Sequence, residues 1–90
     1  DIDAVARNII AEAGFGDNSG HSLGHSVGIE IHEKPNFAPR SEDIVEIGNV
    51  MTVEPGIYIE GFGGVRIEDV IAVAENNINL TKTSKELMIL

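Results

Sequence analysis

The stretch that most restricts how this chain can fold runs from Gly20 to Glu33, where all three histidines of the 90 residues occur. A His-x-x-x-His spacing puts two imidazoles on one helical face, but the glycines at positions 20, 24 and 28 strongly disfavour a helix here. We therefore expect a shaped loop over Gly20–Gly28, followed by a strand over Ile29–His32. A solvated turn that carries incidental histidines is the alternative at this point.

Composition sets the size of the fold and excludes several classes of protein. Ninety residues suffice for one small domain with a modest core. No apolar run approaches the roughly 20 residues that a membrane span needs, and no signal segment opens the chain. The sequence has no cysteine, which excludes disulfides and thiolate metal sites and suits a reducing, cytoplasmic location. Because the first residue is Asp1 and not Met, we expect a trimmed N-terminus or a piece of a longer protein.

The net charge is strongly negative, with 15 acidic residues against 6 basic ones and a formal value of −9. A surface of this kind repels phosphate backbones and anionic lipids. We therefore expect neither nucleic acid nor a membrane as a partner. The same surface suits cation binding, although most of the acids are expected to be plain solvated surface.

Apolar periodicity predicts one helix and several strands. Apolar side chains recur at helical spacing in the first 13 residues, which predicts an amphipathic packing helix over Asp1–Ala13. Three further strands are expected, at Val50–Glu54, Ile57–Glu60 and Val65–Ala74. The glycine-rich segment Gly61–Gly64 is expected to join the last two as a hairpin. The apolar tail Leu87–Leu90 is expected to pair onto the sheet, because an exposed apolar end promotes aggregation.

Two carboxylates stand out by their surroundings. Glu54 lies in an otherwise uncharged run, and Glu68 lies in a β-branched strand two residues from Arg66. If the two segments pair through the Gly61–Gly64 connection, both carboxylates can point into one cleft, where they need a cation or a shared proton. With one histidine they would form a nitrogen and carboxylate set suited to Mn²⁺, Fe²⁺, Co²⁺ or Zn²⁺. The alternatives are an ion pair of Glu68 with Arg66 and a Glu54 that accepts backbone hydrogen bonds.

Four motifs in order carry a resemblance that covers nearly the whole chain. They are Gly-His-Ser-Leu-Gly-His25-Ser-Val-Gly, Ile-His32-Glu-Lys-Pro, Thr-Val-Glu54-Pro-Gly-Ile-Tyr and Gly-Gly-Val-Arg66-Ile-Glu68-Asp. The chain resembles the C-terminal part of the pita-bread metallopeptidases, most closely the Xaa-Pro dipeptidases and aminopeptidases, with the methionine aminopeptidases as more distant relatives. The resemblance implies an α+β fold, with an N-terminal helix on a mainly antiparallel sheet. Residues 1–90 would then form the C-terminal half of a catalytic domain.

The resemblance also implies a pair of divalent metal ions with a bridging water or hydroxide as nucleophile. By motif match, the metal ligands are His25, Glu54 and Glu68, of which Glu68 would bridge both ions. The ions would be Mn²⁺, Co²⁺, Zn²⁺ or Fe²⁺. Two aspartates that complete this set in the family lie upstream of its helix and have no counterpart here, so the chain would supply three of five metal ligands.

The remaining site residues follow from the same motifs. Glu54 matches the glutamate often assigned as general base. His32 matches the histidine that contacts the scissile peptide and stabilises developing charge, and His21 matches a cleft histidine near the substrate. Arg66 matches an arginine that supports Glu68. Ser22 and Ser26 replace glycines found in many members, which is a small departure.

The expected function is therefore that of a piece of a dinuclear exopeptidase that hydrolyses short peptides, with Xaa-Pro bonds as the preferred class. The isolated piece is expected to be inactive. The alternatives are a methionine aminopeptidase-like enzyme and a non-catalytic pita-bread module that serves binding or assembly. Because half of such a fold exposes an apolar sheet face and a sheet edge, we also expect self-association, with a homodimer as one form.

Overall fold

The structure is a computed structural model, and it describes residues 2–89. The chain begins with helix α1 (Ile2–Glu12) and a short 3-10 helix, η1 (Gly16–Asn18). Seven strands follow in the described residues: β1 (Gly24–Ser26), β2 (Glu33–Phe37), β3 (Val50–Val53), β4 (Gly56–Ile59), β5 (Gly63–Arg66), β6 (Asp69–Ala72) and β7 (Ile78–Asn79). The predicted helix is confirmed over Ile2–Glu12, whereas Ala13 lies in the turn that follows and Asp1 lies outside the described residues.

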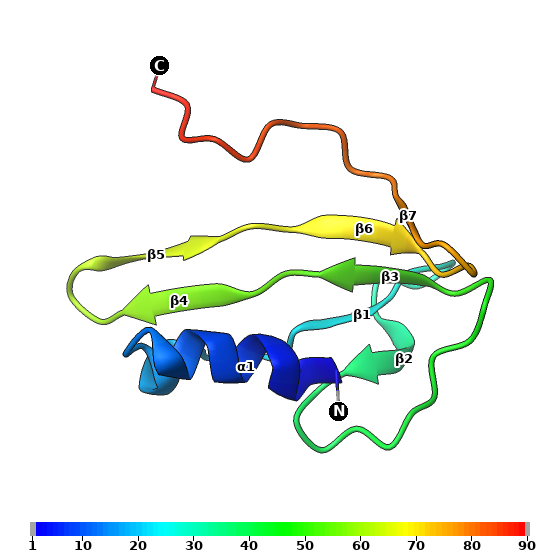
Figure 1. The fold of residues 1–90 in the computed structure, drawn as a ribbon, viewed down its shortest axis with the longest axis horizontal. Coiled ribbons are helices and arrows are strands. Elements are labelled where there is room, and N and C mark those ends of the chain that lie inside the picture. The colour runs from blue at the N-terminus through cyan, green and yellow to red at the C-terminus, as the bar shows by residue number, and fades with distance from the viewer. Residues whose placement is uncertain (1, 90) are drawn as a thin grey trace.

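The strands form a five-stranded sheet in the order β2-β1-β3-β6-β7 and a two-stranded sheet of β4 and β5, with antiparallel pairing throughout. The pairs Val53↔Asp69 and Gly56↔Arg66 keep the same offset, so β3–β4 and β5–β6 are the two arms of one long hairpin (Figure 1). Pro55 interrupts the ladder because it has no N–H to donate. Its carbonyl accepts from the Ile67 N–H at 3.4 Å, which keeps the arms together.

The core is small and lies between the sheet and α1. Its buried apolar residues are Leu23, Phe37 and Met51. The partly buried side chains packed against them are Ala6, Val45, Val53, Ile71 and Val73. Most of the apolar stripe of α1 is not covered: Ile2, Val5 and Ile9 are exposed and line an apolar groove of about 400 Å³ between the helix and the sheet. The helix is buried only at Asp3.

Two predicted strands differ from the structure. Residues 29–32 form bends and not a strand, and β1 lies inside the predicted loop. The reason is local: the Gly28 N–H donates to the Glu30 carbonyl at 3.1 Å, and the Glu33 carboxylate accepts the Glu30 N–H at 2.8 Å. These bonds close a tight loop in place of a ladder. The predicted strand over Val65–Ala74 is divided into β5 and β6, because Ile67 and Glu68 lie opposite the interruption at Pro55.

The tail prediction is also wrong over its described part. Residues 87–89 form no strand, and Leu90 lies outside the described residues. The sheet edge next to β6 is occupied instead by β7, through the pairs Ile71↔Asn79 and Ala72↔Ile78. In Figure 1 the chain after β7 runs away from the sheet as a coil. No helix in residues 2–89 has the length and apolar character that crossing a membrane requires.

Candidate functional site

Neighbouring strands bring His25 and Glu54 together. His25 lies in β1, which pairs with β3 at Ser26↔Met51, and Glu54 directly follows β3. The His25 N–H donates to Thr52 Oγ1 at 3.0 Å, and the Glu54 N–H donates to the Leu23 carbonyl at 2.7 Å. These backbone bonds hold the two residues at diagonal cross-strand positions, where side chains meet. His25 Nε2 lies 3.3 Å from Glu54 Oε2, and the two side chains are 19% and 17% exposed.

The other nitrogen of His25 orients the ring. Nδ1 lies 3.0 Å from the Ser26 carbonyl oxygen. When Nδ1 carries the proton and donates to that carbonyl, Nε2 presents its lone pair to Glu54. A neutral nitrogen and a carboxylate oxygen that face each other are both acceptors, so a proton or a cation between them satisfies both. One imidazole nitrogen and one carboxylate form a donor pair that fits a divalent transition metal ion.

Glu68 stands across the hairpin from Glu54. The constant offset from Val53↔Asp69 to Gly56↔Arg66 makes the two glutamates opposite neighbours at the interruption of the ladder. The predicted pairing of their segments is therefore confirmed. Both Arg66 and Glu68 are exposed. Within residues 2–89, no three His, Cys, Asp or Glu side chains lie close enough together to hold a metal ion, so His25 and Glu54 are joined by no third such group.

Neither alternative role of the two glutamates, an ion pair of Glu68 with Arg66 or a Glu54 carboxylate that accepts backbone hydrogen bonds, is found in the described residues. Ion pairs in the described residues join Asp3 to Arg7 and Asp69 to Lys85, and the His25 imidazole contacts the Glu54 carboxylate. Arg66 and Glu68 therefore do not form the structural ion pair that their spacing allowed. The Glu54 carboxylate contacts the His25 imidazole, and it is the Glu54 backbone that takes part in strand pairing.

The other two histidines lie in different surroundings. His32 lies in the bend before β2, and its ring centroid is 4.4 Å from that of His25, with 59° between the planes. His21 turns to β4 instead: its Nε2 is 2.7 Å from the Tyr58 hydroxyl and its Nδ1 is 2.8 Å from the Ser22 carbonyl oxygen. The three histidines therefore divide into a His25–His32 pair, of which His25 contacts Glu54, and a His21 that contacts Tyr58.

Tyr58 is a site residue to which the sequence assigned no role. Its cross-strand partner is Gly64, and a Cβ there would lie 2.5 Å from Tyr58 Cδ1. The ring therefore lies against backbone that carries no side chain, and its hydroxyl reaches His21. The Asn18 amide donates to the Tyr58 carbonyl at 3.1 Å, which ties η1 to the same strand. The available signal was the position of the chain's single tyrosine, four residues after Glu54.

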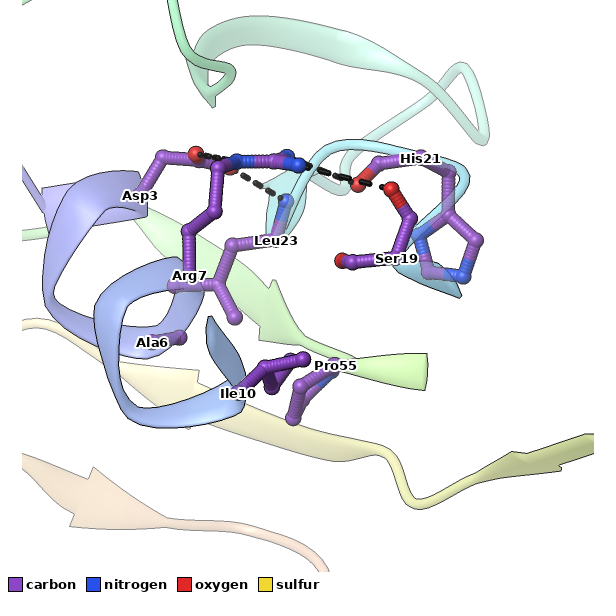
Figure 2. Close-up of a pocket in the computed structure, with 8 residues that line it drawn as sticks. All are labelled: Asp3, Ala6, Arg7, Ile10, Ser19, His21, Leu23 and Pro55. Atoms are coloured by element: carbon purple, nitrogen blue, oxygen red, sulfur yellow. Dashed lines mark hydrogen bonds and ion pairs between the residues drawn. The ribbon is translucent and has the colours of Figure 1, made fainter. Parts of the chain in front are cut away.

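Asp3 and Arg7 also contact the histidine segment, residues 19–25, a role that the sequence did not indicate. They lie one helical turn apart on α1, and Figure 2 shows them facing the backbone that leads into β1. The Arg7 Nε donates to Asp3 Oδ2 at 2.8 Å. Helical residues four positions apart are neighbours, so the sequence could have indicated the Asp3–Arg7 ion pair. It could not have indicated that the pair contacts the backbone of the histidine segment.

Comparison with known proteins identifies the family. Residues 1–75 match the family model described as metallopeptidase family M24. The chain is 52% identical over 89 residues to the Xaa-Pro dipeptidase of Pyrococcus horikoshii and 54% identical over 91 residues to an uncharacterized peptidase of Bacillus subtilis. These alignments cover 98% and 100% of this chain but 25% and 26% of the relatives, so the chain spans about a quarter of their length.

Solved structures agree with the sequence matches. The Xaa-Pro dipeptidase from Bacillus anthracis superposes with a TM-score of 0.92 at 55% identity, and the X-Pro aminopeptidase from Thermotoga maritima with 0.91 at 40% identity. Each match covers 98% of this chain and 25% of the other. The expected α+β fold, a part of the pita-bread architecture, is thereby confirmed. The chain belongs to metallopeptidase family M24.

Proposed function

We propose that this chain is part of the catalytic domain of a dinuclear metal-dependent exopeptidase that hydrolyses short peptides at Xaa-Pro bonds. The observation that carries the proposal is the contact of His25 Nε2 with Glu54 Oε2 at 3.3 Å, in a chain of a metallopeptidase family. Relatives named Xaa-Pro dipeptidase in Pyrococcus horikoshii and Pyrococcus furiosus, each 52% identical, support the substrate class.

Within the longer protein, three side chains of this chain would contribute to holding the two divalent ions, which we propose to be Mn²⁺, Co²⁺, Zn²⁺ or Fe²⁺. His25 would give its Nε2, while Glu54 and Glu68 would give carboxylate oxygens from opposite arms of the hairpin. Divalent ions bound there would supply Lewis-acid polarisation of the peptide carbonyl and activation of the attacking water. Arg66, two residues from Glu68, would support that carboxylate.

The chain's own groups would move the protons and bind the substrate. The Glu54 carboxylate is proposed to take the proton of the attacking water as the new C–O bond forms. The His32 imidazole, beside His25, would donate a hydrogen bond to the oxygen on which negative charge develops. His21, held by Tyr58, would contact the peptide further along the cleft. The C–N bond then breaks, and the leaving amine takes up the proton that the Glu54 carboxylate received.

The first test measures metal binding by the 90-residue chain. We expect calorimetric titration with Mn²⁺ to give binding that is lost in His25→Ala. The matched control is His21→Ala, which removes an imidazole from the same segment that faces Tyr58 and not Glu54. The control variant should bind Mn²⁺ as the unaltered chain does. Equal binding by the unaltered chain and His25→Ala would overturn the assignment of His25, whereas no binding by either would mean that metal binding needs the rest of the longer protein.

A second test measures the activity. In the Pyrococcus horikoshii Xaa-Pro dipeptidase, the 89 matched residues would be replaced by this chain. We expect the chimera to hydrolyse an Xaa-Pro dipeptide only with added divalent metal, and Glu54→Gln to lower the rate by roughly 10²–10⁴-fold. A folded chimera that binds metal but cleaves no Xaa-Pro bond would contradict the proposed substrate class.

We also propose that the 90-residue chain self-associates through the apolar groove beside α1. Exposed apolar patches of this kind mark interaction sites, and Ile2, Val5 and Ile9 are all exposed along it. Sedimentation should detect a dimer or larger species that Val5→Asp disrupts. Ile29→Asp, outside the groove at a fully exposed position, should leave the association intact. A chain that stays monomeric at high concentration contradicts the proposal.

The cytoplasmic location expected from the cysteine-free composition stays a prediction.

A further inference from the structure

We propose that Asp3 and Arg7 of α1 are positioning residues that fix the histidine segment, residues 19–25, against β3. The inference rests on the proposed function, because the segment carries two of the residues to which that function assigns roles. It goes beyond that function because it assigns a role to α1, and none of the four sequence motifs includes a residue of that helix.

The Arg7 guanidinium joins the helix to two carbonyls of the segment. Its Nε donates to Asp3 Oδ2 at 2.8 Å, its Nη2 donates to the His21 carbonyl at 3.1 Å, and its Nη1 reaches the Ser19 carbonyl at 3.4 Å. In Figure 2 the planar group lies between the carboxylate on one side and the two carbonyl oxygens on the other. Only a forked donor can serve all three acceptors from one side chain.

The Asp3 carboxylate holds the next part of the segment directly. It is 2% exposed, and its Oδ1 accepts the Leu23 N–H at 3.0 Å. The same N–H also donates to the Phe37 carbonyl of β2 at 2.8 Å, so it is shared between helix and sheet. A buried carboxylate is costly unless it is paired. Its partners here are the Arg7 guanidinium and the Leu23 N–H, and both contacts connect α1 to the histidine segment.

The Leu23 backbone connects Asp3 to Glu54. Its N–H is held by Asp3, and its carbonyl accepts the Glu54 N–H at 2.7 Å. His25 lies two residues further along β1, with its Nε2 3.3 Å from Glu54. A shift of the Leu23 backbone therefore changes the His25–Glu54 separation. The hold on the His21 carbonyl likewise fixes where the imidazole meets the Tyr58 hydroxyl, 2.7 Å away.

The clamp formed by Asp3 and Arg7 favours the charged form of the Arg7 guanidinium. The side-chain hydrogen bond with Asp3 raises the pKa of Arg7 above its ordinary value. A raised pKa contributes stability that is present below the unfolded value and is lost only as pH rises through the folded value. Neutral pH lies far below both values, so the Arg7 guanidinium keeps its charge there.

The test compares two variants with a control on the same helix. Arg7→Lys keeps the charge but loses the fork, and Asp3→Asn keeps the shape but loses the charge. Glu12→Gln changes the helix charge by the same unit as Asp3→Asn, at an exposed position that no clamp contact involves. Nitrogen NMR of the histidine rings reports the hydrogen bonds of His21, and amide exchange reports the Leu23 N–H. Neither measurement needs metal.

In Arg7→Lys and Asp3→Asn, we expect the His21 ring signals to move toward those of a histidine free in water. Leu23 amide exchange should rise about tenfold, while that of Ile57 in β4 stays nearly unchanged. Mn²⁺ affinity should fall by about 10–100-fold, as it does when groups that support metal ligands are lost. Glu12→Gln should match the unaltered chain in all three readouts.

Two results would overturn the inference. If both variants lower thermal stability but leave the His21 ring signals and the relative exchange of Leu23 unchanged, the pair only anchors the helix. If both variants match Glu12→Gln throughout, the contacts have no effect. Failure of the proposed function is distinguishable from both results, since it appears as absent Xaa-Pro cleavage by the folded chimera, while the ring and exchange measurements still decide the clamp.

Discussion

Replacing Gly24 with alanine should separate the two strands that carry His25 and Glu54. Gly24 lies in β1 against Thr52 of β3. An added Cβ would overlap the Thr52 carbonyl oxygen and would lie 2.7 Å from the carbonyl carbon and 3.0 Å from Oγ1. Ordinary contact begins at 3.4 Å, and the closest atoms are backbone that no rotamer change can move. The strands must therefore move apart by roughly 1 Å or more.

The cost follows from the bonds across this gap. Separation weakens the Glu54 N–H bond to the Leu23 carbonyl and the His25 N–H bond to Thr52 Oγ1, each worth about 1 kcal/mol. Overpacking adds about 1–3 kcal/mol. We therefore expect a loss of about 3–5 kcal/mol, which is large against the roughly 5–15 kcal/mol of a typical domain.

The same movement should abolish metal binding. His25 Nε2 and Glu54 Oε2 are 3.3 Å apart. Opening the strands would take this separation beyond about 4.2 Å, the largest span that two ligands at roughly 2.1 Å from one ion can bridge. The donor pair would then no longer serve a single ion.

The assays are urea unfolding at a fixed protein concentration and Mn²⁺ titration. Gly20→Ala is the matched control, because a Cβ there meets only Tyr58 Cδ2, at 3.9 Å. That variant should stay within about 1 kcal/mol of the unaltered chain, since the loss of glycine freedom is itself mildly stabilising. If Gly24→Ala unfolds at the same urea concentration as Gly20→Ala and binds Mn²⁺ equally well, the close strand contact does not hold the site.

Three further substitutions test the core and the His21–Tyr58 contact. Met51 is fully buried, so Met51→Ala should cost about 2–5 kcal/mol in urea unfolding, and a smaller loss than about 1 kcal/mol would contradict the assigned core. Tyr58→Phe removes the hydroxyl bonded to His21 and should change the nitrogen NMR signals of that ring while lowering stability by about 1 kcal/mol. Gly64→Ala displaces the Tyr58 ring and should reproduce the change at His21, whereas unchanged His21 signals in both variants would rule out the contact.

The elements that sequence predicted well are those whose signals are local. The α1 helix, β3, β4 and the hairpin turn were all found within a residue or two, from apolar periodicity and from the glycines of Gly61–Gly64. The pairing that sets Glu54 opposite Glu68 followed from the same turn. Periodicity also marked the apolar face of α1, but a pattern shows which face is apolar and not what covers it, and Ile2, Val5 and Ile9 lie exposed.

The strand predicted at Ile29–His32 was wrong because alternation alone does not choose a ladder. Ile29 and Ile31 alternate with polar residues as in a strand, yet both are exposed. The Glu33 carboxylate accepts the Glu30 N–H and favours a turn instead. A side-chain acceptor three residues away competes with a backbone carbonyl for the same N–H. The alternating pattern did not indicate which of the two would accept the Glu30 N–H.

The candidate site shows why the sequence did not indicate the roles of Asp3 and Arg7. Apart from their own ion pair, Asp3 and Arg7 bond to backbone groups, which every residue carries, so their targets leave no mark on the sequence. The same holds for Leu23, whose N–H and carbonyl link α1 to Glu54 regardless of its side chain. Motifs therefore identify the side chains that would bind metal and substrate, while the positions of those side chains depend on backbone contacts that only the fold reveals. Gly24 is the exception, because there the close approach of two backbones excludes any side chain. This backbone contact is therefore visible in the sequence motif, as a glycine.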